Sequence, residues 1–119
     1  MTKEREKELF EKIRRDEIEY EDFQKAEDFL FVFDNGYKFS EKLVEDIISD
    51  FAEVEGEIVS VKIINERRGF IDREIVIKFK NRYFAFIESE EQANYYSDEI
   101  TEVFPKKVII EQIIYEAQK

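Results

Sequence analysis

Residues 57–88 read EIVSVKIINERRGFIDREIVIKFKNRYFAFIE, and this stretch decides the fold. β-Branched and aromatic residues alternate with polar residues twice within it, first over 59–63 and again over 75–79. Alternation with a period of two is typical of strands that bury one face. The stretch therefore predicts antiparallel strands with an apolar face turned toward the core.

A two-residue hairpin turn is predicted at 80–83, where the tetrapeptide KNRY separates two of these strands. Asn tolerates the positive φ that tight hairpin turns require. Centred on this tetrapeptide, the hairpin places Phe79 opposite Phe84 and Ile77 opposite Phe86. Apolar side chains then face one another across the hairpin.

The other elements are predicted from periodicity and capping residues. Helices are expected over 3–15, 19–33 and 41–54, strands over 57–65, 70–80, 82–88 and 103–115, and an acidic loop over 89–101. Ser40 is a cap for the best-specified helix, and Gly36 suits the left-handed position past a helix end. Extended structure is an alternative for the end of 19–33, and a helix for 103–115. The expected architecture is α+β, with N-terminal helices packed on one face of a three- to four-stranded antiparallel sheet.

Composition narrows the function classes. The chain has 119 residues, enough for one domain over 1–119, and contains neither His nor Cys. The commonest catalytic bases, thiol nucleophiles and zinc ligands are therefore absent. A metal-dependent nuclease strand needs an acid and a lysine two residues apart, whereas Glu74 and Lys78 are four apart. We expect a protein that is not an enzyme and that needs no cofactor and no metal.

The net charge of −11 indicates which partners to expect. An acidic surface repels nucleic acid and anionic membranes and attracts basic proteins. The chain has no apolar stretch of membrane-spanning length and no signal-peptide pattern near its first residue. These features predict a cytoplasmic protein that binds neither membrane nor nucleic acid directly.

The negative charge is concentrated in three blocks. Residues 16–28, 41–57 and 83–102 each carry a net charge of −6. If the fold brings such blocks together, their carboxylates could imitate a row of phosphates and occupy a basic cleft. The alternative is an ordinary solvated surface. A cluster of basic residues lies on the predicted hairpins and is expected to line the exposed sheet or to pair with the acidic blocks: Lys62, Arg67, Arg68, Arg73, Lys78, Lys80 and Arg82.

The candidate partner-binding residues come from the second and third acidic blocks. The carboxylates are Glu41, Glu45, Asp46, Asp50, Glu90, Glu91, Asp98 and Glu99. Tyr95 and Tyr96 are the candidate anchors, because aromatic residues are enriched at binding hot spots. The alternative for this pair is that one tyrosine covers the core.

In size, acidity, lack of His and Cys, and its acidic, tyrosine-containing stretch EEQANYYSDEITE, the chain resembles small proteins encoded by phages and other mobile elements. That group includes anti-CRISPR proteins and DNA mimics that bind nucleases. The resemblance implies inhibition by occupancy, without catalysis. The partner would be a basic nucleic-acid-binding protein, such as a Cas nuclease in the host cytoplasm, whose DNA or RNA cleft is blocked.

Three other classes fit the same composition. One is an antitoxin or immunity protein that neutralises a basic toxin. Another is a small enzyme or metal-binding protein built on carboxylates alone. The last is a small assembly domain whose apolar edge strands form a homodimer.

Overall fold

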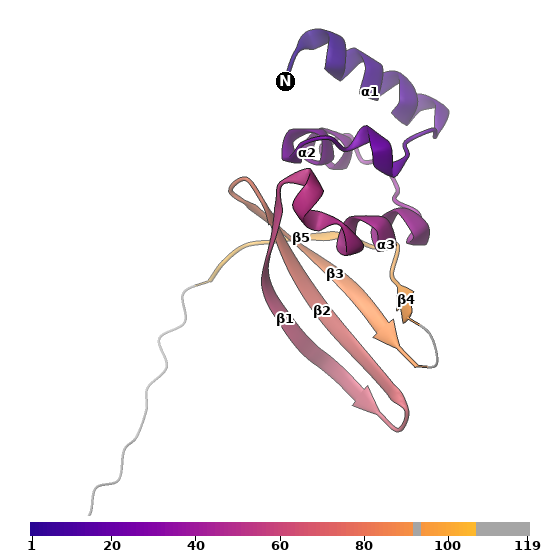
Figure 1. Ribbon diagram of the computed structural model, residues 1–119, viewed down its shortest axis with the longest axis vertical. Helices are drawn as coiled ribbons and strands as arrows, with labels where there is room; N and C mark the ends of the chain where they lie inside the picture. The colour runs from indigo at the N-terminus through magenta and orange to yellow at the C-terminus, as the bar shows by residue number, and fades with distance from the viewer. Residues whose placement is uncertain (92–93, 107–119) are drawn as a thin grey trace, which may run out of the picture.

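The computed structural model describes residues 1–91 and 94–106. In chain order the elements are α1 (Lys3–Arg15), η1 (Tyr20–Asp22), α2 (Ala26–Asp34), α3 (Glu41–Ser49), η2 (Phe51–Val54), β1 (Gly56–Arg67), β2 (Phe70–Phe79), β3 (Arg82–Glu90), β4 (Asn94–Tyr96) and β5 (Thr101–Val103), where η denotes a 3₁₀ helix. Figure 1 shows the helices gathered at one end of the sheet, with β1, β2 and β3 running on beyond them.

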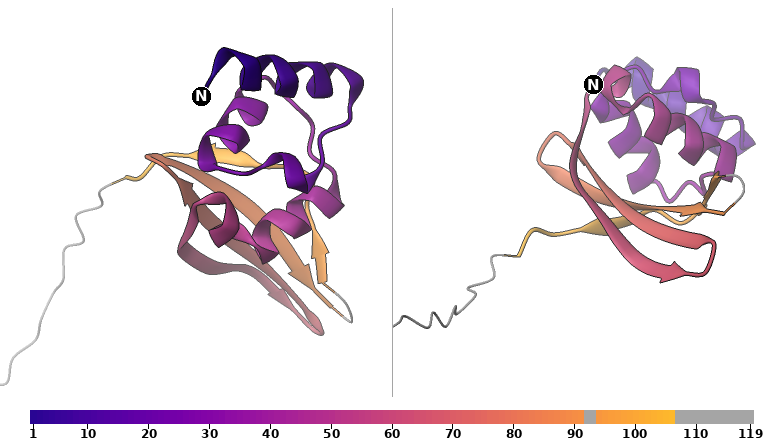
Figure 2. Two further views of the ribbon diagram at one scale, coloured as in Figure 1. Left: turned by 45° about the horizontal axis from the view of Figure 1, so that its top comes forward. Right: turned by 60° about the horizontal axis from the view of Figure 1, so that its bottom comes forward.

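The predicted α+β class is confirmed. Neighbouring strands pair antiparallel in the order β1-β2-β3-β4, and β5 pairs with β3 beside β4. Figure 2 shows the helices on one face of this sheet. Helix α1 packs on α2 and forms the outermost layer, whereas α3 lies against β4. β1 is consequently one edge of the sheet, and α3 stands over the opposite edge.

Helix α3 forms where its cap and its apolar stripe predict it. The Ser40 hydroxyl accepts a hydrogen bond from the Leu43 amide at 3.1 Å, and Leu43, Val44 and Ile47 are buried. The α-helix is shorter than the predicted 41–54, because it ends at Ser49 and a 3₁₀ turn follows.

The single helix predicted over 19–33 is wrong. Two short helices, η1 and α2, replace it and are separated by an extended linker. Two carboxylates explain the break, because they accept backbone N–H groups that a continuous helix would use. Asp22 accepts from the Glu19 amide at 2.9 Å, and Asp28 accepts from the Gln24 and Lys25 amides at 3.0 and 2.9 Å. The end of this region is helical rather than extended, and Gly36 follows it with φ 73° as predicted.

The predicted hairpin register is wrong by two residues. Phe79 lies opposite Arg82, and Ile77 lies opposite Phe84. The turn is formed by Lys80 and Asn81, and the positive φ, 57°, is at Lys80 rather than at the Asn. A shift of two preserves the side-chain faces, because the strand repeat is also two. The apolar faces therefore still match.

The acidic segment 89–101 is more regular than predicted. Strand β3 extends through Glu90, and the short strands β4 and β5 add to its free side. The strand predicted over 103–115 lies mostly in 107–119, outside the described residues.

The core is an aromatic cluster between α2 and the sheet. Phe29 stacks on Phe79 at a centroid distance of 4.3 Å and meets the edge of Phe84 at 5.0 Å. Phe23 and Phe39 extend the cluster toward α3. This cluster lies beneath the helices and leaves the far ends of β1 and β2 without such cover.

The prediction of a buried face is therefore wrong for β1. Val61 and Ile63 are 58% and 52% exposed, although β2 carries buried Ile75 and Ile77 beside this strand. The described helices cover only the part of the sheet around Phe79, Phe84 and Phe86. The alternation predicted for β1 is therefore correct, but no described helix covers Val61 and Ile63 on its apolar face.

Candidate functional site

Two of the three acidic blocks come together where α3 lies against β4. Tyr96 occupies this junction. Its neighbours include Glu88, which pairs across from it in the sheet, and Glu45 of α3. Burial raises the pKa of Tyr96, and the Glu88 and Glu45 carboxylates raise it further. The phenol therefore stays neutral beside these negative groups.

The start of α3 faces the third acidic block. Lys38, which precedes the helix cap, lies 4.0 Å from the Asp98 carboxylate. Both line one surface hollow with Phe39 and Glu99. Asp98 and Glu99 thus lie beside the segment 37–39 that leads into α3.

The end of α3 carries a further group of acids around Tyr20. The Tyr20 hydroxyl donates to the Asp50 carbonyl oxygen at 3.2 Å and lies 3.4 Å from the Glu53 carboxylate. Burial raises the pKa of Tyr20 to about 12, with further contributions from Glu53 and Asp50. Sequence reasoning missed Tyr20 and Glu53, because a helix over 19–33 assigned this tyrosine to the core face.

We call the surface around α3 the acidic face. It consists of Glu41, Glu45, Asp46, Asp50, Glu53, Asp98 and Glu99. Asp46 accepts from Lys42 at 2.9 Å, and Asp98 faces Lys38. In the described part of the chain, the other members form no ion pair with a basic residue. Most of its charge is therefore not neutralised by basic side chains of the described residues.

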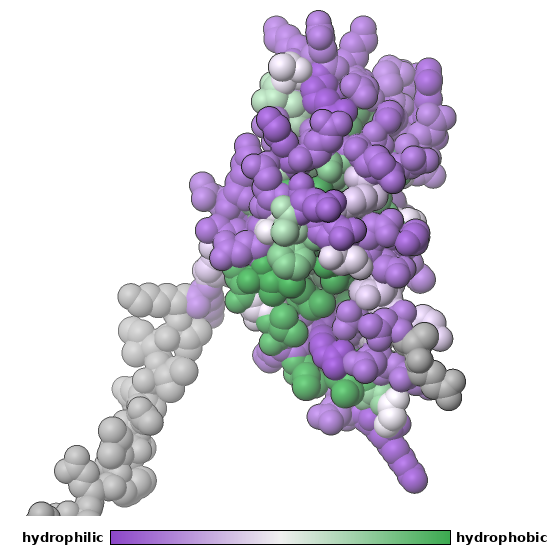
Figure 3. All heavy atoms as spheres, in the orientation of Figure 1, coloured by the Kyte–Doolittle hydropathy of each residue, from purple (hydrophilic) through white to green (hydrophobic). Residues whose placement is uncertain are grey.

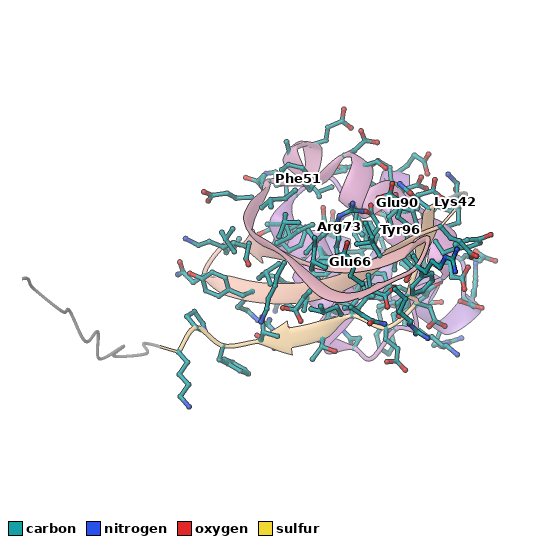
Figure 4. The ribbon with its side chains drawn as sticks, turned by 90° about the horizontal axis from the view of Figure 1, so that it is seen from below. Lys42, Phe51, Glu66, Arg73, Glu90 and Tyr96 are labelled. Carbon is teal, nitrogen blue, oxygen red and sulfur yellow. The ribbon has the colours of Figure 1, made fainter. Side chains whose placement is uncertain are left out.

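Two predicted acids do not join this face. The Glu90 carboxylate lies 2.6 Å from Arg73, which also contacts Glu88 at 3.2 Å. Glu91 lines a hollow with Arg67 at the tip of the β1–β2 hairpin. Figure 4 shows Glu66, Arg73 and Glu90 on successive strands, with Tyr96 and Lys42 beyond them on the β4 side. The far end of the sheet therefore has mixed charge.

The two tyrosines have different surroundings. Tyr96 packs against the core cluster, so the interpretation that one tyrosine covers the core is confirmed for this residue. Tyr95 is 57% exposed. Of the two tyrosines, Tyr95 is the one whose side chain is exposed.

The first acidic block is divided between the scaffold and the surface. Asp22 and Asp28 are buried, and they hold α1 through Lys12 and Arg5. The Arg5 guanidinium also donates to the Asp22 carbonyl oxygen. Glu19 and Glu21 are exposed and line a hollow with Asp46 of α3. Part of block 16–28 therefore lies beside the acidic face.

Both interpretations of the basic cluster hold in part. Lys62, Arg67 and Arg68 are exposed on or next to the β1 edge, whereas three other members pair with acids. The Arg82 guanidinium lies 2.7 Å from Asp34 and 2.9 Å from Glu102, and these two contacts raise the Arg82 pKa. Lys80 lies 3.6 Å from Glu27, and Arg73 pairs as described above. Positive charge on the hairpins thus neutralises acids outside the acidic face.

Among residues 1–91 and 94–106, no group of three or more acidic side chains is arranged to hold a metal ion. No helix in this part of the chain is both long enough and apolar enough to cross a membrane.

Comparison with known proteins adds no assignment. No protein-family model, no curated protein and no solved structure matches this chain. Any functional argument therefore rests on the chemistry of its surfaces.

Proposed function

We propose that this protein is a non-enzymatic inhibitor that docks its acidic face on a basic, nucleic-acid-binding partner in the cytoplasm. An anti-CRISPR protein acting on a Cas nuclease is the most concrete version. Inhibition would follow from occupying the cleft that otherwise holds DNA or guide RNA. The observation that carries the proposal is the packing of α3 beside β4, which gathers carboxylates from two separate blocks.

Electrostatics supports a basic partner. Facing charges of opposite sign accelerate association and disfavour like-charged competitors. Two unpaired members of the acidic face, Glu41 and Glu45, lie on helix α3, which is anchored by buried apolar residues including Val44 and Ile47. Because the backbone that carries these charges is fixed, little ordering is needed when they meet a partner.

Tyr95 supplies an apolar contact beside the charges. It is exposed and follows Asn94 in β4, the strand that α3 contacts. An exposed tyrosine next to acidic groups combines contact area with a hydrogen-bonding hydroxyl. We expect Tyr95 to be the anchor and the acidic face to supply orientation and association rate.

The test is a capture from extracts containing basic nucleic-acid-binding proteins, including Cas nucleases, followed by measurement of the dissociation constant of the captured pair. Reversing charge with Glu45→Lys, Asp98→Lys and Glu99→Lys together is expected to weaken binding by about tenfold or more. Raising the salt concentration should weaken the wild-type complex as well.

Glu6→Lys in α1 is the single-site control, because Glu6 is exposed and lies outside the acidic face. It is expected to change the affinity far less than any one of the three reversals made alone. A complex that is indifferent both to the triple reversal and to salt would overturn the charge-led mechanism. A partner that still binds its nucleic acid while in the complex would overturn inhibition by occupancy.

A further inference from the structure

The β1 strand is a long edge of the sheet. It runs over 12 residues, Gly56–Arg67, and pairs on one side only, with β2. The backbone N–H and C=O groups on its other side have no strand partner in the described part of the chain. Such an edge is a template for another strand.

Exposed apolar side chains accompany this edge. Val59, Val61, Ile63 and Ile64 are each between 44% and 58% exposed. We call these four residues the β1 patch. Figure 3 shows apolar atoms gathered on the sheet below the helices, and Phe51 of η2 lies on the helix side of the sheet in Figure 4. Val61 pairs with Ile75 on the helix-bearing face, whereas Val59 lines a hollow on the other face with Val76. The edge thus exposes apolar side chains on both faces of the sheet, and exposed apolar surface is typical of an interaction site.

The charge of β1 differs from that of the chain as a whole. Its four charged residues are Glu57, Lys62, Glu66 and Arg67, so the strand is neutral in a chain of net charge −11. A strongly charged partner has little to recognise on such an edge. A second copy of β1 offers the same apolar residues without bringing excess negative charge into the contact.

The position of the acidic face favours the same occupant. Its members on α3 and at 98–99 lie toward the β4 side of the sheet, whereas β1 is the opposite edge, which only η2 with Glu53 approaches. Two copies joined along β1 therefore keep most of their acidic side chains away from the contact, where mutual repulsion between them is weaker. Contacts through the acidic face itself would bring like charges together.

The sequence of β1 also selects a register. The strand has irregularities between Ile58 and Ser60 and between Ile63 and Asn65, so the regular run is 60–63. An antiparallel pair centred on Val61 places Val61 against its own copy and Lys62 opposite Ser60. Centring on Lys62 would place two lysines directly opposite each other, which is unfavourable.

We propose that the protein forms a homodimer in which two β1 strands pair antiparallel about Val61 and join the two sheets. The contact is apolar and independent of the acidic face. The dimer should therefore resist salt, whereas the inhibitor complex proposed above should not. A failure of either proposal can thus be recognised without affecting the other.

The first measurement is the mass in solution of the full chain, by sedimentation equilibrium over a series of concentrations. Because a single strand pair is a small interface, the dimer is expected to be reversible and to form by about 500 µM. A mass twice 14.5 kDa that persists in high salt supports the proposal. A mass of 14.5 kDa throughout the series overturns the proposal. That result would instead favour an extended segment of another protein as the strand that pairs with β1.

A matched pair of variants locates the contact. Val61→Lys is expected to abolish the dimer, whereas Phe10→Lys makes the same change at an exposed apolar residue of α1 and should leave the dimer intact. A dimer that survives Val61→Lys uses another surface, and this result would overturn the proposal. Circular dichroism establishes that both variants are folded.

A spin label gives a second readout that leaves the β1 patch unchanged. The natural chain has no Cys, so Ser60→Cys provides a single attachment point next to Val61. In the proposed dimer, two labels at this position lie close together and broaden each other's spectrum. Labels at Lys38→Cys, on the α3 side, should show no broadening. Dimeric protein without broadening at residue 60 would contradict the β1 pairing.

Discussion

Gly56 stands where the chain passes from η2 into β1, and the space around it is already filled. A Cβ atom added there would lie 2.8 Å from the Phe51 carbonyl oxygen, 2.9 Å from Phe79 Cε1 and 3.0 Å from Ile77 Cγ2. The constraint is steric, because one of the three neighbours is a backbone atom and the other two are core side chains. Gly56 thus allows η2 to approach the sheet closely.

Gly56→Ala is therefore expected to destabilise the fold. Overpacking of a filled site costs about 1–3 kcal/mol, and urea denaturation would measure that loss in the free energy of unfolding. Ser60→Ala on the same strand is the control, because Ser60 is exposed and should change stability by less than about 0.5 kcal/mol. Equal stabilities of the two variants would contradict the crowding at Gly56.

Tyr20 reports the electrostatics of the acidic face. Its pKa is raised to about 12, first by burial and then by Glu53 and Asp50. Because this folded-state pKa exceeds the ordinary value of 10.0, the stability contribution is fully present below pH 10 and is lost as the pH rises toward 12. An ultraviolet titration that follows tyrosinate absorbance measures the Tyr20 pKa, and Tyr20→Phe assigns the signal to this residue. Glu53→Gln should lower the Tyr20 pKa toward 10.0, whereas Glu4→Gln in α1 should leave it unchanged.

At the scale of the elements, side-chain carboxylates decide where helices begin and end. Asp28 accepts a hydrogen bond from the Lys25 amide at the start of α2 and is paired with Arg5 at 3.2 Å. It therefore joins the N-terminal layer to the rest of the fold, although sequence analysis grouped it with surface acids.

Asp28→Ala is expected to lower the free energy of unfolding by about 3 kcal/mol, because it removes the buried ion-pair partner of Arg5 and the acceptor of two backbone amide hydrogen bonds. Glu21→Ala, in the same acidic block but exposed, should cost less than about 0.5 kcal/mol. Thermal or urea denaturation compares the two. Similar losses in both variants would show that Asp28 has no special structural role.

Prediction of elements from the sequence succeeded where one physical signal dominated. Strands β1, β2 and β3 and helix α3 follow from side-chain alternation and from the cap at Ser40. The prediction of a single helix over 19–33 is wrong, because the spacing of apolar residues does not reveal that Asp carboxylates compete with backbone carbonyl groups for N–H donors. The hairpin register failed for a related reason. Its turn uses Lys80 with positive φ, whereas propensity favours Asn81.

At the scale of the whole molecule, the sequence predicts how much negative charge the protein carries but only partly where that charge lies. The third block reaches α3 as Asp98 and Glu99, while Glu90 is neutralised by Arg73. In block 16–28, Asp22 and Asp28 form ion pairs with α1, whereas Glu19 and Glu21 remain exposed. Sequence patterns do not contain the packing of one helix on another, so they cannot separate exposed carboxylates from structural ones.

The partial cover of the sheet also determines how substitutions should be tolerated along one strand pair. On β2, Ile77 and Phe79 lie in the interior, so a polar replacement there removes folding energy. On β1, Val61 and Ile63 already meet solvent, so a polar replacement there should cost far less folding energy. The proposed pairing of two β1 strands accounts for their apolar character, and the hairpin would then combine one strand constrained by folding with another constrained by association.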